Sequence, residues 1–362
     1  MFGVFCAPST MTIPLDPSTL SLKPVRIAVV GLRFGDAMAR LIHDELPCYE
    51  ITAVCDQLRD RADSLAAYTG AKALYDLDAV LSDPSIEAVA LFTGPRGRAE
   101  IAGRILAAGK HLLTTKPFEL DAVAQERVLR QAVEAGLVVH LNSPSPLPAA
   151  DIRLIRRWQE EHDLGRIVAL RAETWANYRE KADGGWYDED SACPAAPITR
   201  LGIYFLNDFF PLLGEVNRVQ VMQSRLFTGR PTADNAQITA EFANGCLANV
   251  FASFCIDDGD PYRDEVTLNF QNGTVRRFVH RTPDRRMHVD HAELSLTRAG
   301  HPVERVELPG GAYAGWYEWE AFVRAVRGDN SVPRVMERET AYGTRLLDAV
   351  ARSVASGLPE KP

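Results

Sequence analysis

The sequence contains few cysteines and no arrangement of them that is typical of a metal site or a disulfide framework. Six cysteines are scattered over 362 residues, and no two of them form a Cys-x-x-Cys pair. Such scattered cysteines are typical of proteins whose thiols stay reduced, so we expect a cytoplasmic protein. His280, His288 and His291 do not complete a ligand set, and we expect no bound metal. We expect these histidines at an exposed strand edge and in the loop after it.

The sequence also lacks long apolar runs and an excess of positive charge. No apolar segment approaches the roughly 20 residues that a membrane-spanning helix needs. The 40 basic and 48 acidic residues give a net charge of −8, which disfavours a phosphate-backbone partner. We therefore expect a soluble protein with neither a membrane nor a nucleic-acid partner. Residues 1–23 lack the basic and apolar segments of a secretion signal, and their proline, serine and threonine content predicts a flexible arm.

The length and apolar content of the chain suit two domains. A chain of 362 residues exceeds the size at which one hydrophobic core usually stops growing, and 46% apolar residues can supply two cores. Residues 24–145 alternate between short apolar runs and segments with helical spacing, which indicates βαβ units around a parallel sheet. We expect strands at 25–30, 51–55, 72–75, 88–92, 111–115 and 137–141, and helices at 36–46, 58–68, 97–108 and 121–135.

The pattern changes in residues 146–362, where helices are combined with longer strands of alternating polar and apolar residues. Such alternation is typical of an antiparallel sheet, and Asn272-Gly273 predicts a hairpin turn between two strands. We expect strands at 167–175, 219–226, 237–242, 246–254, 265–271 and 274–280, and helices at 150–161, 317–327 and 337–356. The predicted fold class is α/β, with an N-terminal Rossmann dinucleotide-binding domain and a C-terminal α+β domain. Because the open, mostly antiparallel sheet needs a partner for its second face, we expect a homodimer or homotetramer through it.

The first expected strand leads directly into a turn that contains two glycines. In dinucleotide-binding folds this turn must be tight, and its backbone must approach the pyrophosphate at the start of a helix. Gly31 and Gly35 suit that role, but Arg33 and Asp36 stand where further glycines are usual. We expect Gly31, Arg33, Phe34 and Gly35 to bind the cofactor, with the Arg33 guanidinium on a phosphate. Asp36 is expected to cap the following helix.

Asp56 ends the second expected strand, where a carboxylate can accept hydrogen bonds from the ribose hydroxyls of a dinucleotide. A carboxylate at this place disfavours a 2′-phosphate, so the sequence predicts NAD as cofactor, with NADP less favoured. Arg59 and Arg61 follow closely and leave NADP open. The alternative interpretation of Asp56 is a solvated aspartate in a turn.

Two further segments carry a resemblance to a known family. Lys116-Pro117 follows the strand at 111–115, and Gly202-Ile-Tyr-Phe-Leu-Asn-Asp208 follows a long loop. With the glycine turn and with Glu87-Ala-Val-Ala-Leu-Phe-Thr-Gly-Pro95 they occur in the family order. The chain resembles the glucose–fructose oxidoreductase, inositol dehydrogenase and MocA family over nearly its whole length. The resemblance is to the branch of the family that uses a tyrosine.

The resemblance implies the roles of several side chains. Lys116 is placed beside the nicotinamide, in a Lys116–Pro117 peptide that is expected to be cis, and Tyr204 takes the place of an acid/base histidine. An adjacent ammonium stabilises phenolate, so Tyr204 can take the alcohol proton while Lys116 holds the substrate oxygen. Thr93 and Asn142 are expected at the cofactor, and Asn207 at the substrate. Tyr204 as a core phenol and Asn207 as a packing residue remain open.

Several positions depart from the family pattern. Thr115, Arg98 and Arg200 stand where a glutamate, a histidine and an aspartate are usual. Arg200 can select an acidic or heavily hydroxylated substrate through bidentate contacts, or it can belong to a structural ion pair. Residues 176–199 include Trp186, and aromatic rings packed on sugar faces would suit a substrate pocket. An oligomer contact and a disordered flap are the alternatives for this loop.

These features together predict an oxidoreductase that depends on NAD(P). It would transfer hydride between the nicotinamide and a hydroxyl or ketone of a sugar, sugar acid or polyol. One alternative is an enzyme whose tightly bound NAD is used transiently for elimination, epimerisation or glycoside cleavage. The other is a non-catalytic dinucleotide-binding protein, which Arg33 and Asp36 in the glycine turn would favour.

Overall fold

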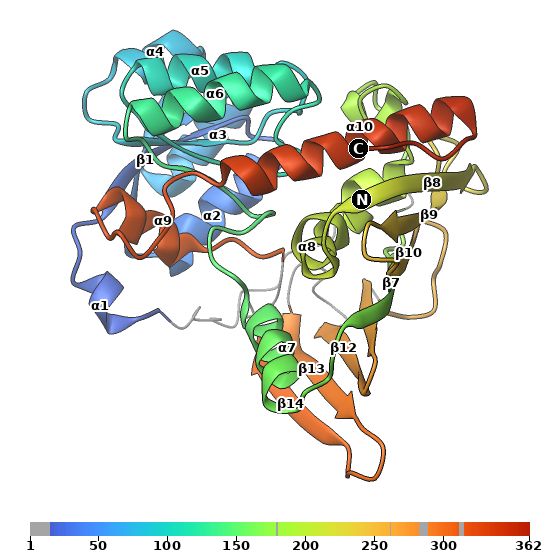
Figure 1. The fold of residues 1–362 in the computed structure, drawn as a ribbon. Helices are drawn as coiled ribbons and strands as arrows, with labels where there is room; N and C mark the ends of the chain where they lie inside the picture. Colours follow the sequence, from blue (N-terminus) through green and yellow to red (C-terminus); the bar gives the residue numbers. More distant parts are fainter. Residues whose placement is uncertain (1–14, 179, 261, 282–288, 311–314) are drawn as a thin grey trace.

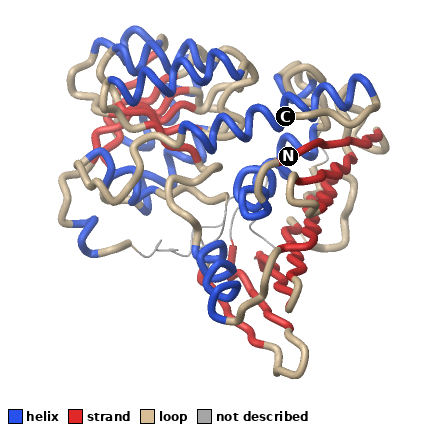
Figure 2. Tube along the Cα trace, in the orientation of Figure 1, coloured by secondary structure: helices blue, strands red, loops and turns tan. Residues whose placement is uncertain are grey.

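A computed structural model of the chain describes residues 15–178, 180–260, 262–281, 289–310 and 315–362. Within these residues the chain builds two sheets with helices packed on them, as Figures 1 and 2 show. Most of the expected N-terminal arm lies outside the described part. Its remainder contains the short helix α1 (Pro17–Leu20), where the Asp16 amide donates to Glu320 Oε1 over 2.7 Å.

The first sheet is parallel and has the strand order β3-β2-β1-β4-β5-β6. Its strands are short and apolar because helices cover both faces, so every residue of β4 is buried. The helix α4, which the sequence did not predict, begins after Asp76, whose side chain accepts from the Ala79 amide. The elements are β1 (Val25–Val30), α2 (Gly35–Glu45), β2 (Tyr49–Cys55), α3 (Arg59–Thr69), β3 (Lys72–Leu74), α4 (Leu77–Ser82), β4 (Ala88–Leu91), α5 (Arg98–Ala107), β5 (His111–Thr114), α6 (Ala122–Glu134) and β6 (Val139–Leu141).

The strand order of this sheet reverses between β1 and β4. One connection leads from β1 outward to β2 and β3, and the next returns to β4 on the other side of β1. In open α/β sheets the ligand crevice lies outside the carboxyl ends of the strands at such a reversal. The turns after β1 and β4 are therefore the expected floor of a dinucleotide site. The predicted Rossmann fold is confirmed.

The second sheet has eight strands in the order β14-β13-β12-β11-β7-β10-β9-β8. It is antiparallel except for β7 and β10, which run parallel. The sequence did not predict β13 and β14, and the hairpin turn lies at Gln271-Asn272, because Phe270 pairs with Gly273. The strands are β7 (Ile167–Trp175), β8 (Val216–Ser224), β9 (Asn235–Phe242), β10 (Leu247–Ser253), β11 (Arg263–Phe270), β12 (Gly273–Arg281), β13 (Val289–Thr297) and β14 (Glu304–Pro309).

The histidines of these strands lie elsewhere than expected. His280 on β12 is paired with His291 on β13, and their rings stack with centroids 4.3 Å apart. Because β12 and β13 both have a neighbour on each side, the expectation of an exposed strand edge is wrong for these two residues. His288 lies outside the described residues. Over the described ranges, no group of three or more His, Cys, Asp or Glu side chains is arranged to hold a metal ion.

Helical segments cover one face of the second sheet. They are α7 (Ala150–Glu161), two π-helical segments η2 (Ile198–Gly202) and η3 (Phe205–Phe209), α8 (Phe210–Leu213) and α10 (Glu337–Ser356). Figure 1 shows α10 extending from the first sheet's helices to β8. Thr344 Oγ1 donates to Gln125 Oε1 of α6 over 2.5 Å, and Ser353 Oγ accepts from the Val221 amide of β8 over 3.0 Å. The helix α10 thus joins the two halves.

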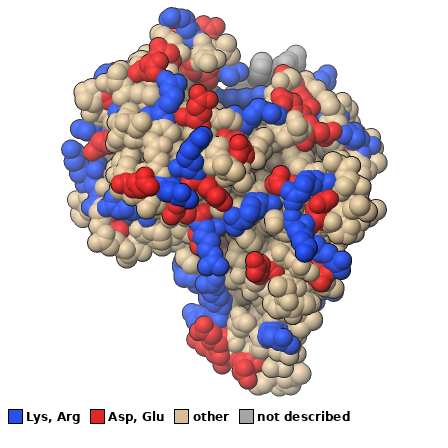
Figure 3. Space-filling model, turned by 45° about the horizontal axis from the view of Figure 1, so that its top comes forward, with Lys and Arg blue, Asp and Glu red and all other residues tan. Residues whose placement is uncertain are grey.

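The helix α9 (Trp319–Val326) returns to the first sheet although it follows the second sheet in the chain. Trp319 and Phe322 are buried in the core below β1 and β2, and Tyr49 Oη donates to the Trp319 carbonyl over 2.7 Å. Figure 3 shows acidic and basic side chains interspersed over the face in view. In the described part of the chain, no helix is both long and apolar enough to cross a bilayer.

Candidate active site

The structure brings Lys116 and Tyr204 together at the carboxyl edge of the first sheet. Lys116 follows β5, and the Lys116–Pro117 peptide is cis, which confirms that expectation. Tyr204 precedes the π-helical segment η3, which packs on the second sheet. The Lys116 Nζ atom lies 4.5 Å from the centroid of the Tyr204 ring. The ring also packs against Gly315, where an added Cβ would lie 2.7 Å from the ring carbon Cδ1. The two halves of the chain thus meet at this contact.

Asn142, which follows β6, connects the lysine to the tyrosine. Its Oδ1 accepts hydrogen bonds from the Lys116 amide (3.1 Å) and from Thr115 Oγ1 (3.3 Å). Its Nδ2 donates to Tyr204 Oη over 3.3 Å and to the Gly315 carbonyl over 3.4 Å. One amide side chain thereby fixes the backbone of Lys116 and the phenol oxygen of Tyr204. We call Lys116, Asn142 and Tyr204 the lysine–tyrosine centre.

The Lys116 ammonium lies in surroundings that disfavour its charge. Its Nζ donates to the Arg200 carbonyl over 2.5 Å. Burial, together with the positive charges of Arg200 and Arg98, lowers the pKa of Lys116 to about 7, although the Cys193 thiol acts in the opposite direction. A lysine with such a pKa can gain or lose a proton at neutral pH, as a group beside a reacting hydroxyl must.

A second layer of polar side chains supports the lysine–tyrosine centre from behind. Ser143 follows Asn142, accepts from Asn207 Nδ2 over 3.1 Å, and donates to Asp208 Oδ2 over 2.8 Å. Burial raises the pKa of Asp208 to about 7, and the Asp151 carboxylate contributes in the same direction. The sequence comparison did not single out Asp208, because the family motif assigns the position before it. Its contact with Ser143, 65 residues away in the chain, could not be read from the sequence.

The expected substrate residues lie at different places in the structure. The Arg200 guanidinium makes a double hydrogen bond to Glu180 (2.9 and 3.2 Å). Three aromatic rings surround it within 4.8 Å, those of Tyr178, Tyr187 and Phe254. The contact of Arg200 with Lys116 is made by its main-chain carbonyl, which accepts a hydrogen bond from Lys116 Nζ. Trp186 packs against Gly94, which follows β4, so its ring lies on the nucleotide side of the crevice.

The turn after β1 has the close backbone approach that a dinucleotide site needs. Gly31 has a φ of +86°, and an added Cβ would lie 3.0 Å from the carbonyl carbon of Phe92. A Cβ on Gly35 would lie 3.0 Å from the ring of Phe92, which also makes an edge contact with Phe34 at 5.5 Å. The two glycines therefore allow the β1 and β4 turns to pack directly on each other. Arg33 is exposed and forms an ion pair with Asp183.

Two aspartates flank this turn. Asp56 Oδ2 accepts from the Leu32 amide over 2.8 Å, so the carboxylate lies where β2 ends beside the turn, as expected. Asp36 does not cap α2, and that expectation is wrong, because the helix begins at Gly35 after Phe34 without a side-chain cap. Instead, Asp36 accepts from Arg40 Nε over 2.9 Å one helical turn later. Arg40 thus offsets the negative charge of Asp36 near the start of the helix.

Arg98 ties the nucleotide side to the lysine–tyrosine centre. It is 1% exposed, and its guanidinium donates to the main-chain carbonyls of Thr93, Thr115 and Pro117. Thr93 Oγ1 is buried without a hydrogen-bond partner beside this cluster. An arginine in place of the usual histidine is therefore a structural link between the β4 and β5 loops.

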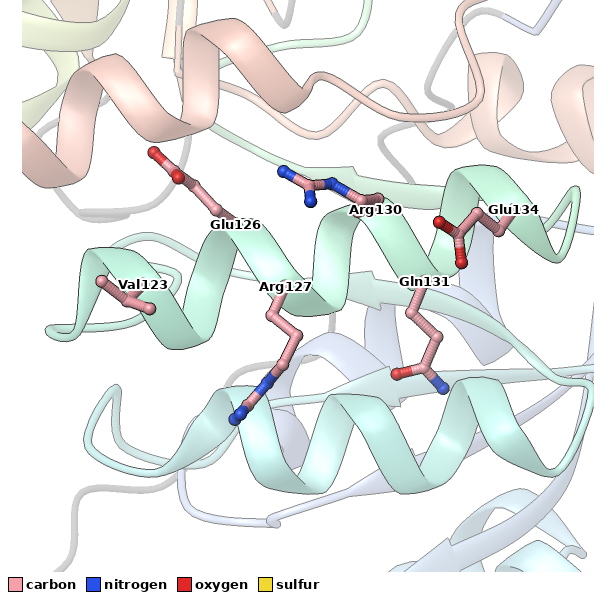
Figure 4. A pocket seen from close by; sticks show the side chains of 6 residues that line it. All are labelled: Val123, Glu126, Arg127, Arg130, Gln131 and Glu134. Carbon is pink, nitrogen blue, oxygen red and sulfur yellow. The ribbon is translucent and has the colours of Figure 1, made fainter.

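Two hollows accompany these features. A surface hollow of about 340 Å³ lies along α6, and Figure 4 shows all of its labelled side chains on that helix, with Arg127 and Gln131 pointing toward α5. It shares no residue with the lysine–tyrosine centre. A cavity of about 10 Å³ lies behind Lys116 and is lined by Asn207 and Thr340, among others. Asn207 Oδ1 and Thr340 Oγ1 are buried there without a hydrogen-bond partner. A cavity of this size holds roughly one water molecule.

Comparisons with known proteins agree with this fold. Residues 25–143 match the family model described as "Oxidoreductase family, NAD-binding Rossmann fold", and residues 152–276 match the GFO/IDH/MocA C-terminal domain. The chain therefore belongs to the GFO/IDH/MocA oxidoreductase family, as the motifs predicted.

Individual relatives are distant. Dehydrogenase AclE of Aspergillus oryzae is 22% identical over 370 residues, which cover 92% of this chain and 97% of that protein. The structure of KijD10, a 3-ketoreductase from Actinomadura kijaniata in complex with NADP and TDP-benzene, superposes with a TM-score of 0.74 at 21% identity over 91% of this chain and 98% of that chain. The WlbA dehydrogenase from Bordetella pertussis, in complex with NADH and UDP-GlcNAcA, has a TM-score of 0.70 at 18% identity over 94% of this chain and 99% of that chain. At these identities the structural likeness shows the fold.

Proposed function

We propose that the protein is an oxidoreductase that transfers hydride between a nicotinamide cofactor and a hydroxyl or ketone of a sugar, sugar acid or polyol. The observation that carries this proposal is the Lys116–Tyr204 contact at 4.5 Å, at the carboxyl edge of a sheet of the dinucleotide-binding type. The relatives support the same class, because one is a 3-ketoreductase and another binds UDP-GlcNAcA, a nucleotide-linked sugar derivative.

The described residues fit a dinucleotide. Gly31 leaves room for no side chain against Phe92, as the tight turn of a pyrophosphate site requires. Gly31, Arg33, Phe34 and Gly35 would hold the phosphates, Arg33 with the guanidinium nitrogens that its ion pair with Asp183 leaves available. Asp56 would hold the adenosine ribose. Thr93, Lys116 and Asn142 would line the nicotinamide end. The cofactor supplies hydride chemistry when bound. We favour NAD over NADP because Asp56 would repel a 2′-phosphate, although relatives bind either form.

The side chains of the lysine–tyrosine centre would divide the proton chemistry between them. In alcohol oxidation, Tyr204 Oη takes the hydroxyl proton while Lys116 donates a hydrogen bond to the same substrate oxygen. The nearby ammonium stabilises the phenolate that starts the reaction. Asn142 keeps Tyr204 Oη and the Lys116 backbone in register through its two hydrogen bonds. In ketone reduction the same proton returns from Tyr204 to the substrate.

Our proposed substrate contacts remain Asn207, Arg200 and Trp186. Each would reach the substrate in a different way. Asn207 lies directly behind the centre and would have to turn its amide toward a substrate hydroxyl. The Arg200 guanidinium would bind a substrate carboxylate only by exchanging it for Glu180. Trp186 would contact the part of the substrate closest to the cofactor.

The proposal is tested by a screen of sugars, sugar acids and inositols with NAD and NADP in both directions. Lys116→Ala and Tyr204→Phe are assayed beside the wild type. We expect each variant to stay folded and to lose about 10²- to 10⁴-fold in turnover, the usual contribution of a proton-transfer group. Full activity in either variant would refute the assigned roles.

We also propose the division of labour and the assembly. Residues 24–145 would bind the dinucleotide, and 146–362 the substrate and the partner subunit, in a cytoplasmic homodimer or homotetramer. Met222, Leu247 and Val168 are 74%, 55% and 52% exposed on the sheet face opposite to the helices, where a second copy would bury them. A monomer in light scattering would contradict this assembly.

A further inference from the structure

A ten-residue segment extends from the second sheet to the nucleotide side of the first sheet. We call residues 181–190 the strap. Asp183 forms an ion pair with Arg33 in the turn after β1. Glu189 accepts from Arg96 in the turn after β4 over 3.0 Å. The strap is thus attached to both turns that form the floor of the crevice.

A third contact lies between these two ion pairs. The Trp186 indole packs on Gly94, where an added Cβ would lie 3.0 Å from the indole carbon Cδ1. Because Gly94 has no side chain, the indole can lie directly on the turn after β4 and cover it. Because β1 and β4 are the adjacent strands at which the sheet order reverses, a dinucleotide bound across them lies under the strap.

The backbone of the strap is held by other contacts than the two carboxylates, Asp183 and Glu189, that reach the turns. Asp188 accepts from the amides of Asp183 and Gly184 over 2.7 and 2.8 Å, and it pairs with Arg230 Nη1 over 2.6 Å. Arg230 is 7% exposed, and Thr232 Oγ1 donates to the Tyr187 carbonyl over 2.8 Å. These contacts fix the backbone of the strap, that of Asp183 included, to the loop between β8 and β9. The contacts of the strap with the two turns depend on ion pairs whose arginines are about 60% exposed, 61% for Arg33 and 59% for Arg96.

We propose that the strap closes over the bound dinucleotide and slows its release, with Arg33–Asp183 and Arg96–Glu189 as latches and Trp186 as the cover. This inference rests on the proposed function. It adds that contacts from the second half of the chain, besides the turns of the first sheet, set the rate at which the cofactor dissociates. A fixed backbone and exposed side-chain contacts suit such a device, because only the side-chain contacts have to break when the cofactor leaves.

The latches set the size of the effect. An exposed ion pair contributes about 0 to 1 kcal/mol, so losing one latch accelerates release by at most about fivefold. Losing both latches leaves the indole contact alone. We expect about two- to fivefold faster release for one latch and about five- to twentyfold for both.

The test measures NADH release directly. Wild-type protein loaded with NADH is mixed with excess NAD in a stopped-flow instrument, and the fluorescence of the directly excited nicotinamide reports the release rate. Asp183→Asn, Glu189→Gln and the double variant are compared with Asp190→Asn. Asp190 is the matched control because it lies in the same segment and pairs with Arg225, away from both turns. The control is expected to stay within twofold of the wild type.

A second readout tests the cover. Energy transfer from tryptophan to bound NADH should fall more in Trp186→Phe than in Trp158→Phe. Trp158 belongs to α7 and is buried in the hydrophobic core of the second sheet. Equal release rates in the wild type and the double variant, or equal transfer in the two tryptophan variants, would overturn the strap. If the wild type binds neither NADH nor NADPH, the proposed function itself fails. The two failures are thereby distinguishable.

Discussion

The turn after β1 and the loop after β5 lie at the same edge of one sheet, but they are held in place by different means. The β1 turn depends on the absence of a side chain at Gly31, whose Cα packs against the backbone of Phe92 and Thr93. The loop after β5 is shaped by side chains, because Asn142 holds the Lys116 amide and the Tyr204 phenol at once. A site built from backbone tolerates unusual side chains, whereas one built from side-chain contacts does not.

This difference explains why the glycine motif can be incomplete. Arg33 and Asp36 replace two glycines, yet their side chains point away from the β1–β4 contact, to Asp183 and Arg40. Gly31, the residue in the closest contact with the backbone of the β4 turn, is retained. The alternative of a non-catalytic protein rested on those two replacements, which this geometry accommodates.

Replacing Gly31 is the largest expected disturbance on the nucleotide side. Gly31→Ala combines an unfavourable φ, about 1–2 kcal/mol, with crowding of about 1–3 kcal/mol against Phe92. We expect the free energy of unfolding to fall by about the sum, and NADH affinity to fall by at least about tenfold because the backbone can no longer approach the phosphates. Thermal unfolding and NADH titration measure the two effects.

Gly70→Ala is the matched control for that prediction. Gly70 ends α3 with a φ of +73°, but an added Cβ there has no atom within 4 Å. It carries the backbone strain without the crowding, so we expect a loss of about 1–2 kcal/mol and unchanged NADH affinity. Equal losses in the two variants would show that the β1 turn is no tighter than an ordinary helix end.

The same contrast decides how much of the molecule could be predicted from the sequence. The short strands of the first sheet were predictable from the sequence, because both of its faces are covered by helices and most of its residues are apolar. The strand β14 was not, since its residues alternate between partly buried and exposed positions and include several charges. Lys116 and Tyr204 were identified through a family resemblance, and their spacing in the sequence alone says nothing of the 4.5 Å contact.

Other parts of the site depend on contacts between distant residues. The pairing of Arg200 with Glu180 inside three aromatic rings, and the hydrogen bonds of Arg98 to main-chain carbonyls of the β4 and β5 loops, leave no periodic pattern in the sequence. Asp208 was overlooked because the family motif assigns the preceding position, Asn207, whereas in the structure both side chains bond to Ser143. Trp186 was expected at the substrate, and only its contact with Gly94 shows it on the nucleotide side.

The lowered pKa of Lys116, in the loop after β5, predicts an effect on protein stability that depends on pH. The pKa of Lys116 is lowered from 10.5 to about 7, so the folded protein bears the cost of a desolvated ammonium fully below pH 7. Between pH 7 and 10.5 the unfolded chain binds more protons than the folded one, and this cost declines as pH rises. Lys116→Met should therefore be inactive but more stable than the wild type, by a few kcal/mol at pH 6 and by less than half of that at pH 9.

Thermal or urea unfolding of the two proteins at pH 6 and pH 9 measures this difference. Lys72→Met is the control, since Lys72 is 62% exposed and pairs with Asp83 at the surface. It should not gain stability at either pH. A Lys116→Met protein that is less stable than the wild type at pH 6 would contradict a desolvated ammonium at this position.

The smallest expected effect concerns the charge of Asp36. Because Arg40 already pairs with it over 2.9 Å, Asp36→Asn should change NADH affinity by less than about twofold. Arg40→Gln removes the compensating charge and leaves an unpaired carboxylate in the first turn of α2, where it repels a phosphate; we expect affinity to fall by about two- to fivefold. The double variant should return to the wild-type value, because no charge is then left to compensate. If instead Asp36→Asn alone strengthens binding severalfold, the carboxylate acts on the phosphates despite Arg40, and the turn is less tolerant of side chains than its backbone geometry implies.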